Sequence, residues 1–219
     1  MKLPAKRDRL SRSFYDRPTD LVARELLGKA LLRRLDGRWL GGWIVETEAY
    51  LPSGDLASHS ARGKTPGNAA MFGPPGTLYV YPIHAKYCMN TVTEAEGFGS
   101  AVLIRAIEPV WGIEQMQENR GTDDLRRLSR GPAMLCQALG VDRSFDTVDL
   151  LDAKHIMIAD RRLVALGDLS SAFSRSSGAG FLAAKARAAP TQIYSQCTLK
   201  SSSDNMANRR SVSSAVSFS

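Results

Sequence analysis

With 219 residues, 43% of them hydrophobic and 23% charged, the chain can bury one full core and has the composition of an ordinary soluble globular protein. It has no apolar run of about 18 residues, no apolar signal segment and no CxxC pair, which argues against a membrane span, a secreted disulfide framework and a zinc ribbon. The net charge of +7 favours a polyanionic partner, and we expect a cytoplasmic protein, associated with the nucleoid if it is bacterial.

The first third of the chain predicts a helix followed by a hairpin. Pro18-Thr19-Asp20 is typical of a helix start, and Gly28 is placed to end a helix over 21–27. Strands are expected at about 30–35 and 39–49, joined by a tight turn at Asp36-Gly37. A polar loop rich in glycine and proline then runs from 52 to 76. Loops of this length in compact domains are more often working surfaces than filler.

The middle of the chain alternates strands and helices. Strands are expected at 78–81 and 101–107, and the second is so continuously apolar that it should be central. Pro109 should end that strand, and 110–118 can form a helix. A further helix over 131–139 has Pro132 in its first turn and Gly140 after its end. Apolar residues at 157–158 and 163–166 predict a last hairpin.

The composition changes beyond Ser170. Thirteen of the last 49 residues are serine, and six basic residues face a single acidic one there. We therefore expect a domain at 1–170, followed at 171–219 by an atypical basic, serine-rich segment that is partly disordered, from Ser201 onward.

The segment Trp43–Leu51 carries the clearest chemical signal. An apolar run ends there in Glu46, Glu48 and Tyr50. Alternate side chains of a strand share a face, so we expect the two carboxylates on one face, with one of them pointing into a cleft. Taken alone, the pattern fits a solvated edge strand better, because charged residues in an alternating pattern are usually exposed.

Six blocks of the sequence resemble, in order and spacing, the alkyladenine or 3-methyladenine DNA glycosylase family over about residues 10–165. The blocks are Val45–Tyr50 with His59, Met71-Phe72, Pro75–Tyr81, Cys88–Asn90, Val102–Pro109 and Gly131–Leu139. The resemblance implies an α+β fold, a single compact domain whose curved, mixed and mainly antiparallel sheet is flanked by helices.

The same resemblance implies a monofunctional repair enzyme. It would flip alkylated or deaminated purines, similar to 3-methyladenine or hypoxanthine, out of duplex DNA and hydrolyse the N-glycosidic bond with an activated water. Its partner would be damaged double-stranded DNA, with no membrane, no cofactor and no metal, and we expect a monomer. Metal binding by His84, Cys88 and Cys136 is disfavoured, because their spacing is unlike that of zinc sites.

The resemblance also implies roles for single residues. Glu48 matches the general base and Arg105 the arginine beside the reacting centre, although Arg105 could equally be a structural partner of a carboxylate. The residues that match the base pocket are Tyr50, His59, Tyr81 and Asn90. Without the family, Tyr79 and Tyr81 read as ordinary strand aromatics, His59 as a loop residue that caps a backbone group, and Asn90 as a turn residue.

Several positions depart from the family pattern. His84 stands where a tyrosine usually intercalates, and Gly67 stands where an arginine is common. Phosphate contacts are expected from Lys64, Lys86 and Arg130. Residues 171–219 do not match the family's ending, and a change of reading frame near residue 170 is one hypothesis for this.

Two other function classes remain open at this point. The chain could be a catalytically impaired protein of the same fold that binds damaged DNA, if the atypical C-terminus spoils the base pocket. It could also be a carbohydrate hydrolase that uses Glu46 and Glu48 as acid and base. The second is disfavoured, because two side chains on one strand face cannot readily flank a glycosidic bond from opposite sides.

Overall fold

The structure of the protein is a computed structural model that describes residues 8–52, 58–160 and 196–199. Its elements in chain order are α1 (Arg12–Tyr15), α2 (Thr19–Leu26), β1 (Ala30–Leu35), β2 (Arg38–Tyr50), the 3₁₀ helices η2 (His59–Arg62) and η3 (Ala69–Phe72), β3 (Leu78–Ile83), β4 (Lys86–Thr93), β5 (Ser100–Trp111), α3 (Ile113–Arg120), α4 (Leu125–Leu128), α5 (Pro132–Leu139), η4 (Arg143–Phe145), β6 (Ile156–Ala159) and β7 (Gln196–Leu199).

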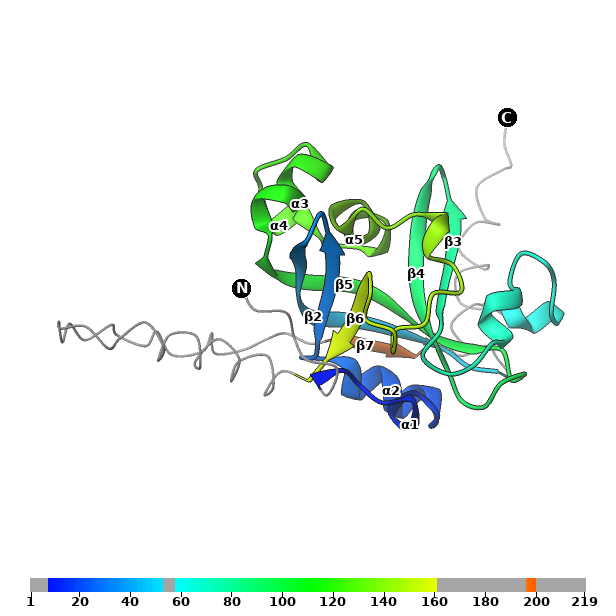
Figure 1. The fold of residues 1–219 in the computed structure, drawn as a ribbon. Helices are drawn as coiled ribbons and strands as arrows, with labels where there is room; N and C mark the ends of the chain where they lie inside the picture. The colour runs from blue at the N-terminus through cyan, green and yellow to red at the C-terminus, as the bar shows by residue number, and fades with distance from the viewer. Residues whose placement is uncertain (1–7, 53–57, 161–195, 200–219) are drawn as a thin grey trace, which may run out of the picture.

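The strands form one curved sheet in the order β3-β4-β5-β2-β1-β6, with helices packed around it (Figure 1). These neighbours are all antiparallel. Strand β2 is long enough that one of its edges pairs first with β1 and then, over Glu46–Ala49, with the parallel strand β7. The α+β class and the mixed, mainly antiparallel sheet expected from the sequence are therefore confirmed.

The two long central strands, β2 and β5, each contain an extra residue. Ile44 pairs with Ile107 and Glu46 with Ala106, which leaves Val45 without an opposing residue, and Arg105 is skipped in the same way. A bulge of this kind shifts the alternation of side chains between the two faces of a sheet. On β2, Ile44 consequently faces the core, and after the bulge the odd-numbered residues face it.

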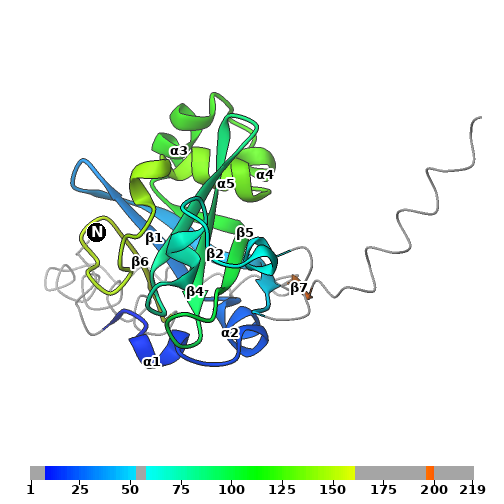
Figure 2. The ribbon, with the colours of Figure 1, turned by 90° about the vertical axis from the view of Figure 1, so that its right-hand side faces the viewer.

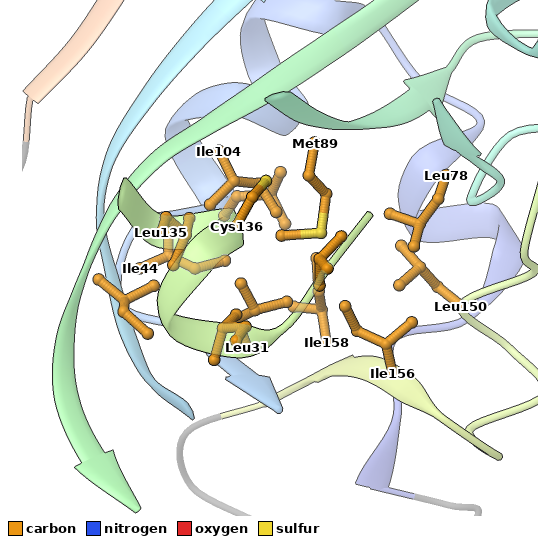
Figure 3. Close-up of a cluster of buried hydrophobic side chains, with 14 of the residues drawn as sticks. Leu31, Ile44, Leu78, Met89, Ile104, Leu135, Cys136, Leu150, Ile156 and Ile158 are labelled. Carbon is orange, nitrogen blue, oxygen red and sulfur yellow. The ribbon is translucent and has the colours of Figure 1, made fainter. Parts of the chain in front are cut away.

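The core face of the sheet is covered by α2 and α5. Leu135 and Cys136 of α5 meet Ile104 and Met89, as Figure 3 shows for part of this cluster. Helix α2 packs against the end of β2, where the Thr47 hydroxyl donates a hydrogen bond of 2.9 Å to a carbonyl of the helix. One continuous apolar core thus fixes the central strands from this side.

Most of the predicted elements are present. The main differences are at β5, α3 and β4, and the short helices α1 and α4 were also not predicted. Strand β5 continues through Pro109 to Trp111, so the expected stop is wrong. Proline is tolerated there because the register between β2 and β5 is irregular at this point. Its partner on β2 is Gly42, and the two backbones lie so close that a Cβ on residue 42 would be 1.8 Å from a carbonyl oxygen of β5. Helix α3 therefore begins later than predicted, at Ile113. Strand β4 was not predicted as a strand.

Three further expectations fall partly or wholly outside the described residues. Only the first strand of the predicted last hairpin, β6, is described. The long loop contains η2 and η3, and its residues 53–57 are not described. Most of 171–219 is also not described, although β7 belongs to it. Within the described residues, no helix has the length and hydropathy that a bilayer span requires.

Candidate active site

The face of the sheet opposite the core carries three groups of side chains, and we call it the site face. At the β1–β6 end lies a cluster around Trp39 and Trp111. At the β3–β4 end lies an aromatic cluster around Tyr79 that includes Met71 of η3. Between them, on β2 and β5, lie the charged residues that the sequence singles out. The bulges place these charges on the site face, because they shift the alternation before Glu46.

Glu46 and Glu48 share this face and contact the same guanidinium. Arg105 donates from Nε to Glu46 Oε1 and from Nη1 to Glu48 Oε2, each over 2.7 Å. The Glu48 side chain is 3% exposed, whereas those of Glu46 and Arg105 are 27% and 31% exposed. The prediction of a shared face is confirmed, and the solvated-edge interpretation is wrong for Glu48, because β2 is a central strand.

The electrostatics of this group reflect the close charges. Burial by itself would lower the pKa of Arg105, but the hydrogen bonds and charges of Glu46 and Glu48 outweigh it and raise this pKa above its usual value. The pKa of the Tyr50 phenol is raised by burial, by the charge of Glu48 and by a hydrogen bond to that carboxylate. Tyr50 therefore stays protonated and donates to Glu48.

Next to the charged group, six residues line a small cavity of about 10 Å³. They are Tyr50, His59, Met71, Tyr79, Tyr81 and Asn90. Four of the six match the base pocket predicted from the sequence, so the structure brings those residues together. The space holds on the order of one water molecule. A purine could enter only if these side chains moved apart.

The aromatic rings in this cavity contact one another directly. The ring centroids of His59 and Tyr81 are 4.5 Å apart, and those of Tyr79 and Tyr81 are 5.4 Å apart. His59 Nδ1 lies 2.7 Å from the Tyr79 hydroxyl. Edge-to-face and tilted pairs of this kind are favourable, so the rings fill the space that a flat ligand would otherwise take.

Tyr79 also lines this cavity, although the sequence interpretation did not select it. Burial, together with the charge of Asp146, raises the pKa of Tyr79 to about 12, so its hydroxyl is protonated and can donate to His59. Burial lowers the pKa of His59. A neutral imidazole that accepts at Nδ1 carries its proton on Nε2. The spacing of Tyr79 and Tyr81, two apart on one strand, was a signal that both face the same side.

Asn90 is a strand residue, so the interpretation as a turn residue is wrong. It is buried in β4 and donates from Nδ2 to the Tyr79 carbonyl over 3.0 Å. The loop before Tyr79 is held in a similar way by Asn68, whose Nδ2 donates to the carbonyls of His59 and Gly63. These amides fix the backbone around the cavity.

The residues expected to contact DNA lie outside the cavity. His84 forms, with Ala85, the two-residue turn between β3 and β4, and both have positive φ, at 45° and 60°. Glycine or asparagine usually fills such a turn, because other residues adopt positive φ only at a cost in conformational energy. His84 and Ala85 bear that cost here. Lys86 follows the turn, and His84, Lys86, Lys64 and Arg130 are all exposed. Their roles remain predictions.

The exposed turn lies at the same end of the molecule as α3 and α4 (Figures 1 and 2). His84 follows Tyr81 by three positions, or about 10 Å of strand. Within the described residues, no group of three or more histidine, cysteine, aspartate or glutamate side chains is arranged to hold a metal ion.

Comparison with known proteins identifies the family of this chain. The family model described as "Methylpurine-DNA glycosylase (MPG)" matches residues 13–172. Among the relatives that carry the name "Putative 3-methyladenine DNA glycosylase" are three from different organisms. The relative from Rhodopirellula baltica is 61% identical in an alignment of 145 residues that covers 64% of this chain and 62% of that protein. The relative from Chlorobaculum tepidum is 53% identical in an alignment of 135 residues that covers 61% of this chain and 65% of that protein. The relative from Clostridium perfringens is 41% identical in an alignment of 166 residues that covers 71% of this chain and 81% of that protein.

The chain spans less than two thirds of the length of the first two relatives. The family match itself covers well over half of the chain and includes every residue of the charged group and the aromatic cavity. This chain therefore belongs to the methylpurine-DNA glycosylase family.

Proposed function

We propose that this protein is a DNA glycosylase that releases alkylated purines such as 3-methyladenine, and deaminated purines such as hypoxanthine, from duplex DNA. Family membership and the names of the relatives support this proposal. The observation that carries it is the buried Glu48, bonded to Arg105 and placed beside an aromatic cavity. Binding to DNA alone has no need for a buried carboxylate in this place.

The reaction requires the target nucleotide to leave the base stack. A base inside the duplex hides its sugar carbon from water, so it must rotate into a pocket at a cost of a few kcal/mol. The turn at His84 is suited to enter the gap that remains, and the neighbouring Ile83, which is 41% exposed, adds apolar area there. Tyr50, His59 and Tyr81 would stack on the extruded base, with Asn90 against one edge.

Glu48 would then activate the water that attacks the sugar. The water oxygen forms a bond to C1′ while its proton passes to the Glu48 carboxylate, and the electron pair of the N-glycosidic bond leaves with the purine. The transition state resembles an oxocarbenium ion, so a carboxylate nearby also stabilises its positive charge. Arg105 would orient both the carboxylate and the water. No lysine or amine nucleophile is needed, so an intact abasic site is the product.

The site also favours cationic bases. Since burial lowers the pKa of His59, the imidazole is uncharged at neutral pH and does not repel an alkylated purine that carries positive charge. The electron-rich faces of the tyrosines attract such a cation. Recognition by charge would discriminate between cationic alkylated purines and normal purines, which are neutral. Hypoxanthine is also neutral, so its recognition would depend on the stacking rings and on Asn90 instead.

The duplex would be held by phosphate contacts. Lys64, Lys86 and Arg130 are exposed, and the chain as a whole carries a net charge of +7. Contacts of this kind are independent of sequence and weaken with salt. They suit an enzyme that searches for damage at arbitrary positions.

The test is release of free base from defined duplexes. Purified protein is incubated with methylated DNA and with a hypoxanthine-containing oligonucleotide, and the free purine is identified by mass spectrometry. We expect free purine and an abasic strand that breaks only after alkali treatment. The matched control is Glu48→Gln. Absence of free purine with the wild-type protein on both substrates would overturn the proposal.

One observation favours a second candidate, a protein that binds damaged DNA without excision. The cavity of about 10 Å³ is too small for a purine as it stands. If the aromatic side chains could not separate, the charged group would never reach a sugar carbon. Tight binding to lesion duplex, combined with no base release at any protein concentration, would favour this candidate.

A further inference from the structure

Glu46 has no part in the chemistry described so far, although it contacts the same guanidinium as Glu48. Its Oε1 accepts from Arg105 Nε over 2.7 Å, which is as short as the bond from Nη1 to Glu48. Its side chain is 27% exposed, against 3% for Glu48. Two carboxylates of different burial thus share one cation.

We propose that Glu46 is a positioning residue: it anchors Arg105 through Nε, and it offsets part of the positive charge that Arg105 would otherwise place on Glu48. This inference rests on the proposed function, in which Glu48 is the general base.

The first support is geometric. Arg105 is the extra residue of a bulge in β5, so no ladder partner opposes it on β2. Its side chain is therefore directed by its own contacts rather than by the regular pairing of the sheet. A bond at Nε and a bond at Nη1 fix both the position and the plane of the guanidinium. Without Glu46, Arg105 would keep one bond to Glu48 and could rotate about it.

The second support is the sum of charges. Arg105 with Glu48 alone is a neutral pair, and the full cation beside the base would weaken its affinity for a proton. With Glu46 the group carries a net charge of −1 when both carboxylates are ionised. That excess negative charge keeps Glu48 basic and stabilises a cationic transition state.

Three other titratable side chains interact with Glu48 and do not confuse this effect, and His59, which lies beyond Tyr81 in the same cavity, is the same in all variants. Tyr50 on β2, Tyr81 on β3 and Cys88 on β4 interact electrostatically with Glu48. Burial raises the pKa of each of the three, and of Cys88 despite a hydrogen bond from Tyr81. They are therefore neutral throughout the range in which a carboxylate titrates, and Arg105 stays charged.

Two substitutions separate the two roles of Glu46. Glu46→Gln keeps an acceptor for Arg105 Nε and removes the charge, whereas Glu46→Ala removes both. The control is Glu108→Gln, which removes a carboxylate opposite Trp43 on the same pair of strands, away from Arg105. It corrects for any gain in DNA affinity that comes from losing one negative charge.

The first measurement follows the ionisation of Glu48 in DNA-free protein by ¹³C NMR of its carboxyl carbon. In Glu46→Gln we expect its titration midpoint to move to lower pH by about one unit, the order of shift expected for losing a like charge that contacts the same guanidinium in a partly screened site. Glu108→Gln should leave the midpoint where it is. This measurement needs no activity, so it tests the inference even if the proposed function fails.

The second measurement is single-turnover base release across pH. We expect the acid limb of the rate profile to move to lower pH in Glu46→Gln, with a plateau about threefold lower because the base is weaker. Glu46→Ala should lose about 100-fold, since Arg105 is no longer held in place. Relative to Glu108→Gln, which has lost the same charge, lesion binding should stay unchanged in both variants. An unmoved NMR midpoint in Glu46→Gln, or equal rate losses in the two variants, would overturn the inference.

Discussion

The charged half and the aromatic half of the site are held in different ways. The charged half stands on the two long central strands, and its three side chains are joined by short hydrogen bonds. The aromatic half stands on the β3–β4 hairpin and on 3₁₀ helices of a long loop, and its rings fill their own cavity. The comparison teaches that the charged group is already assembled, whereas the aromatic cavity would have to open to take the base required by the proposed function.

This difference predicts which defects each half produces. Changes in the charged half should lower the rate of base release and leave binding intact. Changes in the aromatic half should act on binding, or on the choice of base. The variants below test this division, from the largest expected effect to the smallest.

Glu48→Gln should have the largest effect. The amide cannot take a proton from water, so base release should fall by about 100-fold or more, in line with the loss of general-base assistance. Binding to lesion duplex should persist, since the cavity residues are unchanged. Single-turnover release and a gel-shift titration measure the two quantities. Near-normal release in this variant would remove Glu48 from the mechanism.

Arg105→Lys should rank next. An ammonium is a point charge and cannot donate in one plane to both Glu46 and Glu48, so the pair loses its geometry while the positive charge is kept. We expect release to fall by about 10- to 100-fold with little change in binding, because misplacing a catalytic group by 1 Å can cost about 100-fold. If Arg105 only held the sheet together, the melting temperature would fall and the rate of the folded fraction would not.

Tyr79→Phe tests the aromatic half. The phenylalanine keeps the ring and removes the hydroxyl that holds His59 Nδ1. A lost hydrogen bond of this kind is worth about 0.5–1.5 kcal/mol, so lesion binding should weaken by roughly 2- to 13-fold. The rate of base release from the bound complex should hardly change. A rate defect as large as that of Arg105→Lys would break the division between the halves.

The smallest effect is expected at the DNA backbone. Lys86→Ala should weaken binding to damaged and undamaged duplex alike and reduce the salt slope of binding by about one. The control is Lys154→Ala, a substitution of an exposed lysine in the turn before β6. A flat salt titration of the wild-type protein would contradict phosphate contacts altogether.

The sequence predicted the charged half well, for a local reason. Glu46 and Glu48 are two apart on β2, and the bulge at Val45 lies before them, so simple alternation holds between them. It could not predict that Arg105 contacts both, because this depends on a second bulge in β5 and on the register between two strands far apart in sequence. The register between two strands depends on how both strands pack and pair, so it cannot be read from the sequence of one strand alone.

The aromatic half was harder to predict. Strand β4 was missed because His84 and Ala85 lack the glycine or asparagine that marks a tight hairpin turn. Without that strand, Asn90 could not be placed beside Tyr79 except through family resemblance. Pro109 led to the wrong prediction that the strand ends there. Gly42, opposite it on β2, leaves room for the irregular pairing that lets the strand continue through a proline. In each case the deciding interaction came from another part of the chain.

Strand β7 adds a final consequence. It is the parallel neighbour of Glu46–Ala49, so it satisfies backbone groups of β2 that β1 does not reach. A proteolytic cut between residues 160 and 196 that released β7 would leave this stretch as a bare edge, open to strand addition by another molecule. Self-association of the cleaved protein through the stretch that carries Glu46 and Glu48 would then be the first sign of damage to the chain.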